Sequence, residues 1–256
     1  MKIAVISDIH SNPKALRTVL DDAKTQGCER FICLGDIVGY GYDPNTCIDI
    51  CRAEGVECVL GNHDAGLTRK LPLTWFSEWA KAAINRQLCE VDKERKEWLD
   101  NLPYQKKEDF GAWRCCFSHG TYNCPDAFDY IQCYSDALLE MNLMGGECDV
   151  LFVGHTHYAE TFTKDFDDDL NPIFDADNDI SVNLNHYKKI IVNVGSVGYP
   201  RNQPYSYYCI FDTEAQMVHY RRLDFDFEDY VSQMESKGAP IPMWLQRELD
   251  ERRDTH

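Results

Sequence analysis

The chain has 256 residues, of which 44% are hydrophobic, so it can bury a sizeable core and is not disordered as a whole. Its 43 acidic and 26 basic residues give a net charge of −17. A surface this acidic repels nucleic-acid backbones at long range, which disfavours extended nucleic-acid binding. It does not exclude a small phosphorylated substrate, because divalent metal ions can reverse the local field of a site.

The twelve cysteines lack the paired spacing of a zinc or redox motif. Cys47 and Cys51 are four positions apart, and Cys115 and Cys116 are adjacent. We therefore expect reduced, mostly buried thiols in a cytoplasmic protein, and we set aside a structural zinc or redox protein. The apolar run near the start of the chain is too short for a signal peptide, and no run is long enough for a membrane span.

Apolar strands alternate with helices in the N-terminal half of the sequence. The predicted elements, in order, are a strand at 2–7, a helix to about residue 26, a strand at 30–34, a helix at 44–54 and a strand at 56–60. Asn12 or Ser11 can cap the first helix, Pro13 suits its first turn, and Gly27 follows its end. Strands separated by helices of this length predict βαβ units and a parallel sheet.

The second half is predicted to be richer in strands. The predicted elements are a helical stretch at 75–99, a strand at 113–118, a helix at 134–144, strands at 149–153, 187–194, 205–212 and 218–223, and a C-terminal helical pair at about 227–253. The acidic segment 165–179 lacks the glycine and glutamate of a calcium-binding EF-hand loop, so we interpret it as a surface loop of unassigned role. No internal repeat or flexible linker is found, which favours one domain over residues 1–256.

Five short polar clusters follow the predicted strands. They are Asp8-Ile9-His10, Gly35-Asp36, Gly61-Asn62-His63-Asp64, His119-Gly120 and Gly154-His155-Thr156-His157. Ligands of open α/β sheets bind outside the carboxyl ends of the strands, so we expect the five clusters to meet at one edge. A single copy of such a motif arises often by chance, but five in this order, each closing an apolar run, indicate one site.

The side chains of these clusters suit metal ions. Aspartate, neutral histidine and an asparagine carbonyl are ligands for Mn, Fe or Zn. In Asp8-x-His10 and His155-x-His157, strand-like geometry would point both side chains of a pair the same way, so that each pair could hold one metal. Two metals about 3.5–4 Å apart, with a carboxylate such as Asp36 as a bridge, would activate a water and clamp an in-line displacement at phosphorus.

The ordered pattern D-x-H, G-D, G-N-H-[DE], H and G-H-x-H resembles that of the calcineurin-like metallophosphoesterase superfamily. Segments 39–45 and 195–201 also resemble a small bacterial single-domain branch, described as predicted phosphoesterases or diadenosine-tetraphosphatase-like proteins. The resemblance covers nearly the whole chain. It implies a four-layer α/β/β/α sandwich with two mixed β-sheets and the metal site at the C-terminal edge of the strands.

The resemblance also implies roles for individual residues and two divalent metal ions, with Mn, Fe, Zn and Ni as candidates. The implied ligands are Asp8, His10 and His157 for the first metal, Asn62, His119 and His155 for the second, and Asp36 as the bridge. His63 would face the substrate and stabilise the transition state or protonate the leaving oxygen, with Asp64 orienting it. Tyr42 and Arg201 are weaker candidates for substrate contacts, and a structural salt bridge of Arg201 is an equal alternative.

The function implied is hydrolysis of a phosphomonoester or phosphodiester by a metal-bridging hydroxide, on a small phosphorylated substrate for which a nucleotide is one candidate. The sequence departs from the family pattern at Val194, at Asn202 and after His119, none of them an implied ligand, so the substrate stays open. The alternative is a non-catalytic metal-binding scaffold of the same fold. Scaffold members tend to lose a ligand or the residue at His63, and this chain keeps them all. The native metals and the oligomeric state also stay open.

Overall fold

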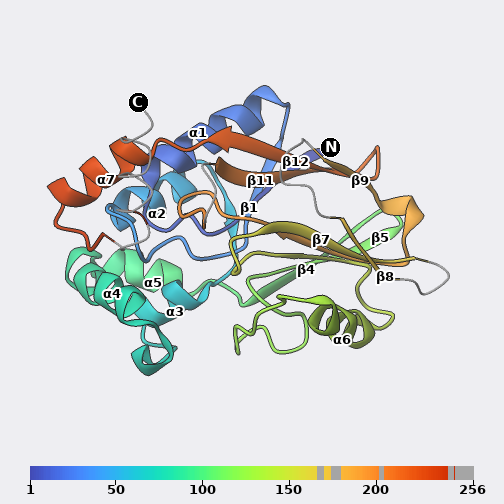
Figure 1. Ribbon diagram of the computed structural model, residues 1–256, viewed down its shortest axis with the longest axis horizontal. Helices are drawn as coiled ribbons and strands as arrows, with labels where there is room; N and C mark the ends of the chain where they lie inside the picture. Colours follow the sequence, from blue (N-terminus) through green and yellow to red (C-terminus); the bar gives the residue numbers. More distant parts are fainter. Residues whose placement is uncertain (166–169, 174–179, 202–204, 242–244, 246–256) are drawn as a thin grey trace.

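The protein is described by a computed structural model that covers residues 1–165, 170–173, 180–201, 205–241 and 245. Two β-sheets of six strands each pack face to face, and helices cover both outer sides (Figure 1). The expected α/β class with two mixed sheets is confirmed, and the four layers follow from the three main hydrophobic clusters between and outside the sheets.

The first sheet has the strand order β3-β2-β1-β11-β12-β9. Its strands are β1 (Lys2–Ile6), β2 (Arg30–Cys33), β3 (Glu57–Cys58), β9 (Ser181–Asn183), β11 (Tyr205–Asp212) and β12 (Met217–Asp224). The first three strands run parallel, as βαβ units require, and β11 pairs with β1 antiparallel. In β1, Ala4 and Ile6 face the outer helices while Ile3 and Val5 face the second sheet, which explains why this strand is apolar throughout.

The second sheet has the strand order β4-β5-β6-β10-β7-β8. Its strands are β4 (Gln105–Phe110), β5 (Trp113–Ser118), β6 (Val150–Val153), β7 (Ala159–Lys164), β8 (Leu170–Ile173) and β10 (Lys189–Val194). Here β5, β6 and β10 are parallel, and the other three strands are antiparallel to their neighbours. Phe117 and Phe152 stack with ring centroids 5.1 Å apart and meet Phe211 of the first sheet, so the core between the sheets is continuous.

The helices divide between the two outer faces. Their bounds are α1 (Pro13–Thr25), α2 (Pro44–Ala53), α3 (Asn62–Leu67), α4 (Glu78–Glu90), α5 (Lys93–Asp100), α6 (Tyr134–Met144) and α7 (Phe227–Ser236), with short 3₁₀ turns η1 (Leu73–Trp75) and η2 (Leu184–His186). Leu16 and Val19 of α1 pack on the first sheet, and Met141 and Met144 of α6 pack on the second. Of the two candidate caps for α1, Asn12 is the one used, because its Oδ1 accepts the Ala15 amide at 3.1 Å.

Three expectations about secondary structure are wrong in detail. The helical stretch expected over 75–99 is divided into η1, α4 and α5, because Ser77 and Asp92 each begin a new helix by capping it. The strand expected over 56–60 pairs only at Glu57–Cys58. Within the acidic segment 165–179, residues 170–173 form β8 rather than a loop, and residues 166–169 and 174–179 lie outside the described part of the chain.

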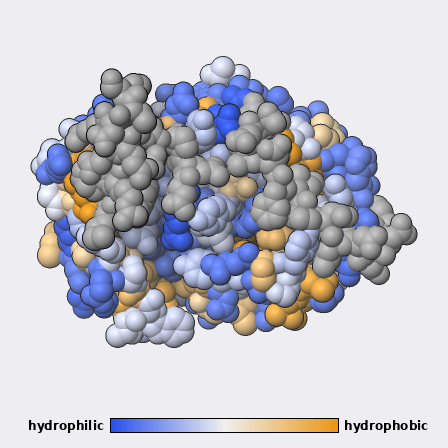
Figure 2. All heavy atoms as spheres, in the orientation of Figure 1, coloured by the Kyte–Doolittle hydropathy of each residue, from blue (hydrophilic) through white to orange (hydrophobic). Residues whose placement is uncertain are grey.

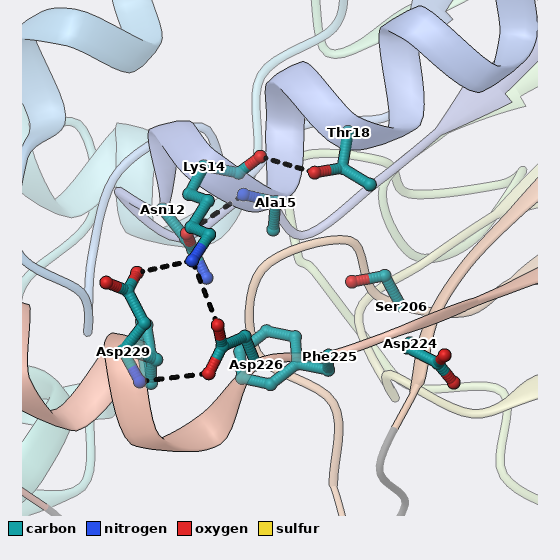
Figure 3. Close-up of a pocket in the computed structure, with 10 residues that line it drawn as sticks. Asn12, Lys14, Ala15, Thr18, Ser206, Asp224, Phe225, Asp226 and Asp229 are labelled. Atoms are coloured by element: carbon teal, nitrogen blue, oxygen red, sulfur yellow. Dashed lines mark hydrogen bonds and ion pairs between the residues drawn. The ribbon is translucent and has the colours of Figure 1, made fainter.

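Helix α7 lies beside the start of α1 (Figure 1). Lys14 of α1 pairs with Asp226 and Asp229, each at 3.0 Å, and together they line a small surface pocket (Figure 3). The pairing gives Lys14 two carboxylate partners, while the buried apolar face of α7 packs it on the first sheet. The second helix of the expected C-terminal pair falls on residues that the structure does not describe, apart from the buried Leu245.

Apolar and polar side chains are interspersed on the described surface seen in Figure 2, without one continuous apolar area on that face. Among the described residues, none of the helices combines the length and the hydropathy needed to cross a membrane. All twelve cysteines are free, and nine of them are buried, as expected for small hydrophobic side chains.

Candidate metal centre

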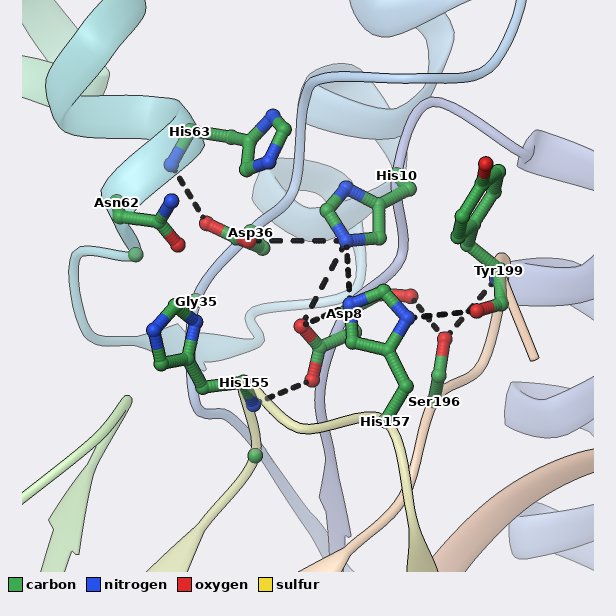
Figure 4. A network of polar contacts seen from close by, with 12 residues as sticks. Asp8, His10, Gly35, Asp36, Asn62, His63, His155, His157, Ser196 and Tyr199 are labelled. Atoms are coloured by element: carbon green, nitrogen blue, oxygen red, sulfur yellow. Dashed lines mark hydrogen bonds and ion pairs between the residues drawn. The ribbon is translucent and has the colours of Figure 1, made fainter. Parts of the chain in front are cut away.

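The five polar clusters meet at one edge of the sandwich (Figure 4). They follow β1, β2, β3, β5 and β6, and each of these five strands pairs in parallel with another of them, so that their carboxyl ends lie at the same edge. All of the aspartates and histidines implied as ligands are at most 5% exposed, and Asn62 is half-buried. Topology, rather than proximity in sequence, therefore assembles the site.

One group of ligand atoms comes from Asp8, His10 and His157. The Nε2 atoms of His10 and His157 lie 3.1 Å apart, and Oδ1 of Asp8 is 3.2 Å from Nε2 of His157. Oδ2 of Asp8 accepts the backbone amide of His155 at 3.0 Å, so the carboxylate is fixed with its other oxygen pointing into the group. That oxygen is buried and has no hydrogen-bond donor among the described residues.

A second group comes from Asp36, His119 and His155, with Asn62 beside it. Nε2 of His119 lies 3.0 Å from Nδ1 of His155 and 3.1 Å from Oδ1 of Asn62. The residue-based expectation that His155 and His157 together grip one metal is wrong, because the two rings lie in different groups. The division implied by the family resemblance, with His157 in the first group and His155 in the second, agrees with this geometry.

Asp36 lies between the two groups (Figure 4). Its Oδ2 is 3.6 Å from Nε2 of His10 and 3.4 Å from Nε2 of His119. Its Oδ1 accepts the backbone amide of His63 at 2.8 Å, which fixes the carboxylate plane. One oxygen atom is therefore directed toward both groups, the arrangement that a bridging ligand needs.

The backbone is unusual at these positions. Five of the implied ligands have a positive φ between 45° and 67°, namely Asp8, His10, Asp36, His155 and His157. Residues other than glycine rarely adopt this left-handed region, and such strain is held only where the surrounding structure enforces it. The strand-like geometry expected for Asp8-x-His10 is therefore wrong, since the chain leaves the strand and turns before these side chains project into the site.

Each of the four ligand histidines faces a backbone carbonyl with one ring nitrogen. The pairs are His10 Nδ1 with Val38 O at 3.0 Å, His119 Nδ1 with Leu34 O at 2.9 Å, His155 Nε2 with Phe128 O at 2.9 Å and His157 Nδ1 with Tyr199 O at 2.7 Å. A carbonyl only accepts hydrogen bonds, so the nitrogen facing it carries the proton and the other nitrogen of a neutral ring presents a lone pair.

The resulting set of atoms fits divalent metal ions. Lone pairs of neutral rings would face each other at about 3 Å in both groups, with carboxylate oxygens beside them, and this arrangement is repulsive without a cation. Nitrogen ligands of one metal ion lie roughly that far apart, given metal–nitrogen bonds of about 2.1 Å. The unpartnered Oδ1 of Asp8 points into the same space.

The electrostatics of the cluster also indicate that it needs positive charge. Burial and neighbouring histidines lower the pKa of His155 well below its usual value. Burial acts in the same direction at His119, but the Asp36 carboxylate outweighs it and raises the pKa of His119 to about 9. Without a metal, a proton on His119 would relieve the lone-pair repulsion in the second group, and a bound cation would take the place of that proton.

His63 lies next to the first group but is held differently from the sequence expectation. Its ring packs edge-on against Phe76 at 5.3 Å and lies 4.6 Å from the Tyr40 ring, and its Nδ1 has no hydrogen-bond partner among the described residues. Burial lowers the pKa of His63 to about 3. A Cβ atom on Gly39, which has φ +90°, would lie 2.1 Å from this Nδ1, so only glycine leaves room for the ring.

Asp64 does not orient His63. Its carboxylate instead accepts the backbone amides of Asp36, Val38 and Gly61 at 2.9–3.1 Å. Burial and the Asp36 carboxylate raise the pKa of Asp64 to about 7, against the effect of its amide donors. Asp64 therefore stabilises the loop that carries the bridging aspartate.

Tyr42 does not contact the cluster either. It is 7% exposed, its ring lies 5.9 Å from that of Tyr230, and its hydroxyl contacts Asn12 at 3.5 Å in the core outside the first sheet. The tyrosine at the site is Tyr40, whose ring lies 4.7 Å from His10 and stacks on Tyr199 at 4.2 Å. Tyr40 and Tyr199 belong to segments 39–45 and 195–201, which resemble the family. These segments therefore reach the site, although Tyr42 does not.

On the opposite side, Tyr130 stacks on the ligand His155 with ring centroids 3.8 Å apart and an interplanar angle of 6°. Arg201 interacts with the Tyr130 hydroxyl, and its charge also acts on Tyr40 and His157. The substrate contact expected of Arg201 stays a prediction. No motif in the sequence pointed to Tyr130, because the loop between β5 and α6 carries it without a recognisable pattern. We call Tyr40, Tyr130, Tyr199 and Arg201 the aromatic rim.

Gln87 of α4 is a further residue that sequence reasoning missed. It is fully buried, its Oε1 accepts the Gly39 amide at 2.7 Å, and its Nε2 donates to Ser11 Oγ at 3.0 Å. A single side chain thus links α4 to the loops after β1 and β2, beside Tyr40 and His63. The sequence signal for Gln87 was a polar residue on the apolar face of an amphipathic helix.

Comparison with known proteins agrees with this site. A family model of the calcineurin-like phosphoesterase superfamily domain matches residues 1–216. The chain is 34% identical over 248 residues to an uncharacterised protein of Methanocaldococcus jannaschii, covering 96% of both. It is similar to the crystal structure of a metallophosphoesterase from Sphaerobacter thermophilus, with a TM-score of 0.77, 30% identity and coverage of 94% and 95% of the two chains.

A crystal structure of a protein from Pyrococcus horikoshii shares the fold at 19% identity, with a TM-score of 0.73 and coverage of 93% of this chain and 94% of that one. The fold, the order of the motifs and the convergent donor atoms lead to the same conclusion as the family match. The chain belongs to the calcineurin-like phosphoesterase superfamily.

Proposed function

We propose that this protein is a phosphoesterase that uses two divalent metal ions to hydrolyse a small phosphomonoester or phosphodiester. The observation that carries the proposal is the position of Asp36 Oδ2, 3.6 Å from His10 and 3.4 Å from His119, between two groups of donor atoms. When bound, two such metals lower the pKa of a coordinated water and neutralise charge on the phosphoryl group.

The chain's own residues have separate tasks in this proposal. The carbonyls of Val38, Leu34, Phe128 and Tyr199 fix the tautomer and orientation of the four ligand rings. His63, held by Tyr40 and Phe76 rather than by Asp64, would face the phosphoryl oxygens or the leaving oxygen. Burial of the ligands excludes water from their hydrogen bonds and keeps the cluster rigid.

A panel of metals and substrates tests the proposal. The purified full chain is loaded separately with Mn, Fe, Zn, Ni or Mg, and turnover is measured on a monoester, a diester, a cyclic nucleotide and a dinucleoside polyphosphate. Metal content is measured by elemental mass spectrometry on the same samples. We expect two metal equivalents per chain and metal-dependent hydrolysis of at least one class, with an Asp36→Asn preparation excluding a contaminating phosphatase.

The outcomes separate the proposal from its alternative. Binding of two metals without turnover of any substrate would favour the non-catalytic scaffold. Full activity with a single equivalent would contradict the bridging role of Asp36. The small phosphorylated substrate, including a nucleotide, stays part of the proposal until this panel identifies the preferred class.

A further inference from the structure

The ring of Tyr130 has one face covered and one face open. Its covered face lies parallel to the His155 ring at 3.8 Å, yet the side chain as a whole is 43% exposed. Tyr199, by contrast, stacks on Tyr40 at 4.2 Å and is only 4% exposed, so its ring offers little accessible surface. The open face is a large apolar surface directly beside the metal ligands.

Arg201 lies within interaction range of this ring's hydroxyl. Its guanidinium interacts with the Tyr130 hydroxyl, and its charge also acts on Tyr40 and His157 on the other side of the cluster. It therefore supplies positive charge to residues of the site in a chain of net charge −17. A guanidinium binds phosphoryl oxygens well.

We propose that the open face of Tyr130 is a stacking subsite for the planar base of a nucleotide substrate, with Arg201 holding both the tyrosine and the phosphate. The inference deepens the proposed function and rests on it. It selects phosphoesters with a nucleobase close to the reacting phosphorus over aliphatic phosphoesters such as sugar phosphates. Stacking on one exposed ring tolerates any base, because every base has a π face.

Adenosine 5′-monophosphate and ribose 5-phosphate test the proposal, because the two esters differ only in the base. Their dissociation constants for the manganese-loaded full chain are measured by isothermal titration calorimetry. We expect the nucleotide to bind roughly 5- to 100-fold more tightly, the range for one stacked base. Equal affinities for the wild-type protein would overturn the inference.

Variants of Tyr130 assign the difference to the ring. Tyr130→Leu should remove most of the preference while leaving the affinity for ribose 5-phosphate within about twofold, and Tyr130→Phe should keep most of it, because the ring face remains. Tyr158→Leu is the control, since Tyr158 is also 43% exposed but has no aromatic ring stacked on it in the described part of the chain. Metal content and thermal unfolding of each variant show that the site is intact.

One further result would contradict the subsite. If Tyr130→Leu weakened both ligands equally, the tyrosine would act only by positioning His155. If Tyr130→Leu did not fold, the wild-type comparison and Tyr130→Phe would still decide. Failure of the proposed function looks different, because it is the absence of metal-dependent hydrolysis of every ester in the panel, whatever the base preference in binding.

Discussion

The metal-ligand cluster and the aromatic rim lie within a few ångströms of each other but are built in opposite ways. The cluster consists of buried side chains, and each of its four histidines donates a ring N–H to a backbone carbonyl, which leaves the other ring nitrogen facing the site. The rim consists of loop residues, one of them 43% exposed, that are held by ring stacking and by one guanidinium. The two regions thus differ in how deeply they are buried and in the kind of contact that holds them.

The sharpest test of the cluster is Asp36→Asn. The asparagine side chain keeps an oxygen that can accept the hydrogen bond from the backbone N–H of His63. It replaces the charged Oδ2 that is directed toward both groups of ligand atoms. We expect turnover to fall by about 10³-fold or more, equivalent to several kcal/mol of transition-state stabilisation, and metal content to fall below two equivalents. The exposed Asp21→Asn in α1 is the matched control. Retention of full activity would contradict the bridging role.

His63→Ala separates substrate chemistry from metal binding. We expect turnover to fall by about 10²-fold, the usual scale of a lost acid–base or hydrogen-bonding group, while metal content stays the same. His186→Ala, an exposed histidine of η2, is the control. Loss of metal from His63→Ala would show that His63 is a metal ligand and would contradict its separate role in substrate chemistry.

Asp64→Asn tests the corrected role of this carboxylate. Three backbone amides donate to it, and an amide side chain presents only one acceptor to them. We expect the free energy of unfolding to fall by about 2 kcal/mol, measured by denaturant titration, because buried donors lose their acceptor. The pH dependence of turnover should keep its shape, whereas a direct effect on His63 would change it.

Gln87→Met tests how the rim is held. Methionine preserves the volume of the side chain but removes its hydrogen bonds to Gly39 and Ser11. We expect KM to rise by about tenfold as the loop carrying Tyr40 loosens, with metal content unchanged. The exposed Asn85→Ala of α4 is the control. An equal loss in metal binding would place Gln87 with the cluster instead of the rim.

The smallest effect is expected at an ion-pair network that lies away from both the metal-ligand cluster and the aromatic rim. It serves as a reference for the effects of the other variants. Arg30 of β2 donates to Glu108 of β4 at 2.8 and 3.0 Å and joins the two sheets. Hydrogen bonds from Arg30 lower the pKa of Glu108 from 4.5 to about 2. Glu108→Gln should cost about 1 kcal/mol at neutral pH, which lowers the melting temperature by about 2–4 °C.

The sign of the pH dependence follows from the lowered pKa of Glu108. The stabilisation is fully present above pH 4.5 and is lost as the pH falls toward 2, so the wild-type protein and Glu108→Gln should converge in acid. Calorimetric scans between pH 7 and pH 2 measure this convergence. Glu94→Gln, at a pair whose carboxylate is 74% exposed, should show a much smaller difference at any pH. A constant gap would contradict the ion-pair explanation.

The sequence by itself determined the class of fold, the order of the strands that end in ligands and the ligand types. Those features depend on local rules, since apolar runs of strand length, helix caps and glycines at sharp turns are readable from neighbouring residues. Its predictions went wrong where a contact joins distant segments. Asp64 turned out to hold backbone amides, and Tyr40 rather than Tyr42 reached the site.

Only the tertiary structure decided which ligands share a group and what surrounds them. His155 and His157 are two residues apart but point into different groups, because both have positive φ values that no strand pattern predicts. Tyr130, from the segment between β5 and α6, meets His155, which follows β6, and Gln87 reaches the same edge from α4. Such contacts join segments that are distant in the sequence, and their packing is a property of the whole chain, not of any motif within it.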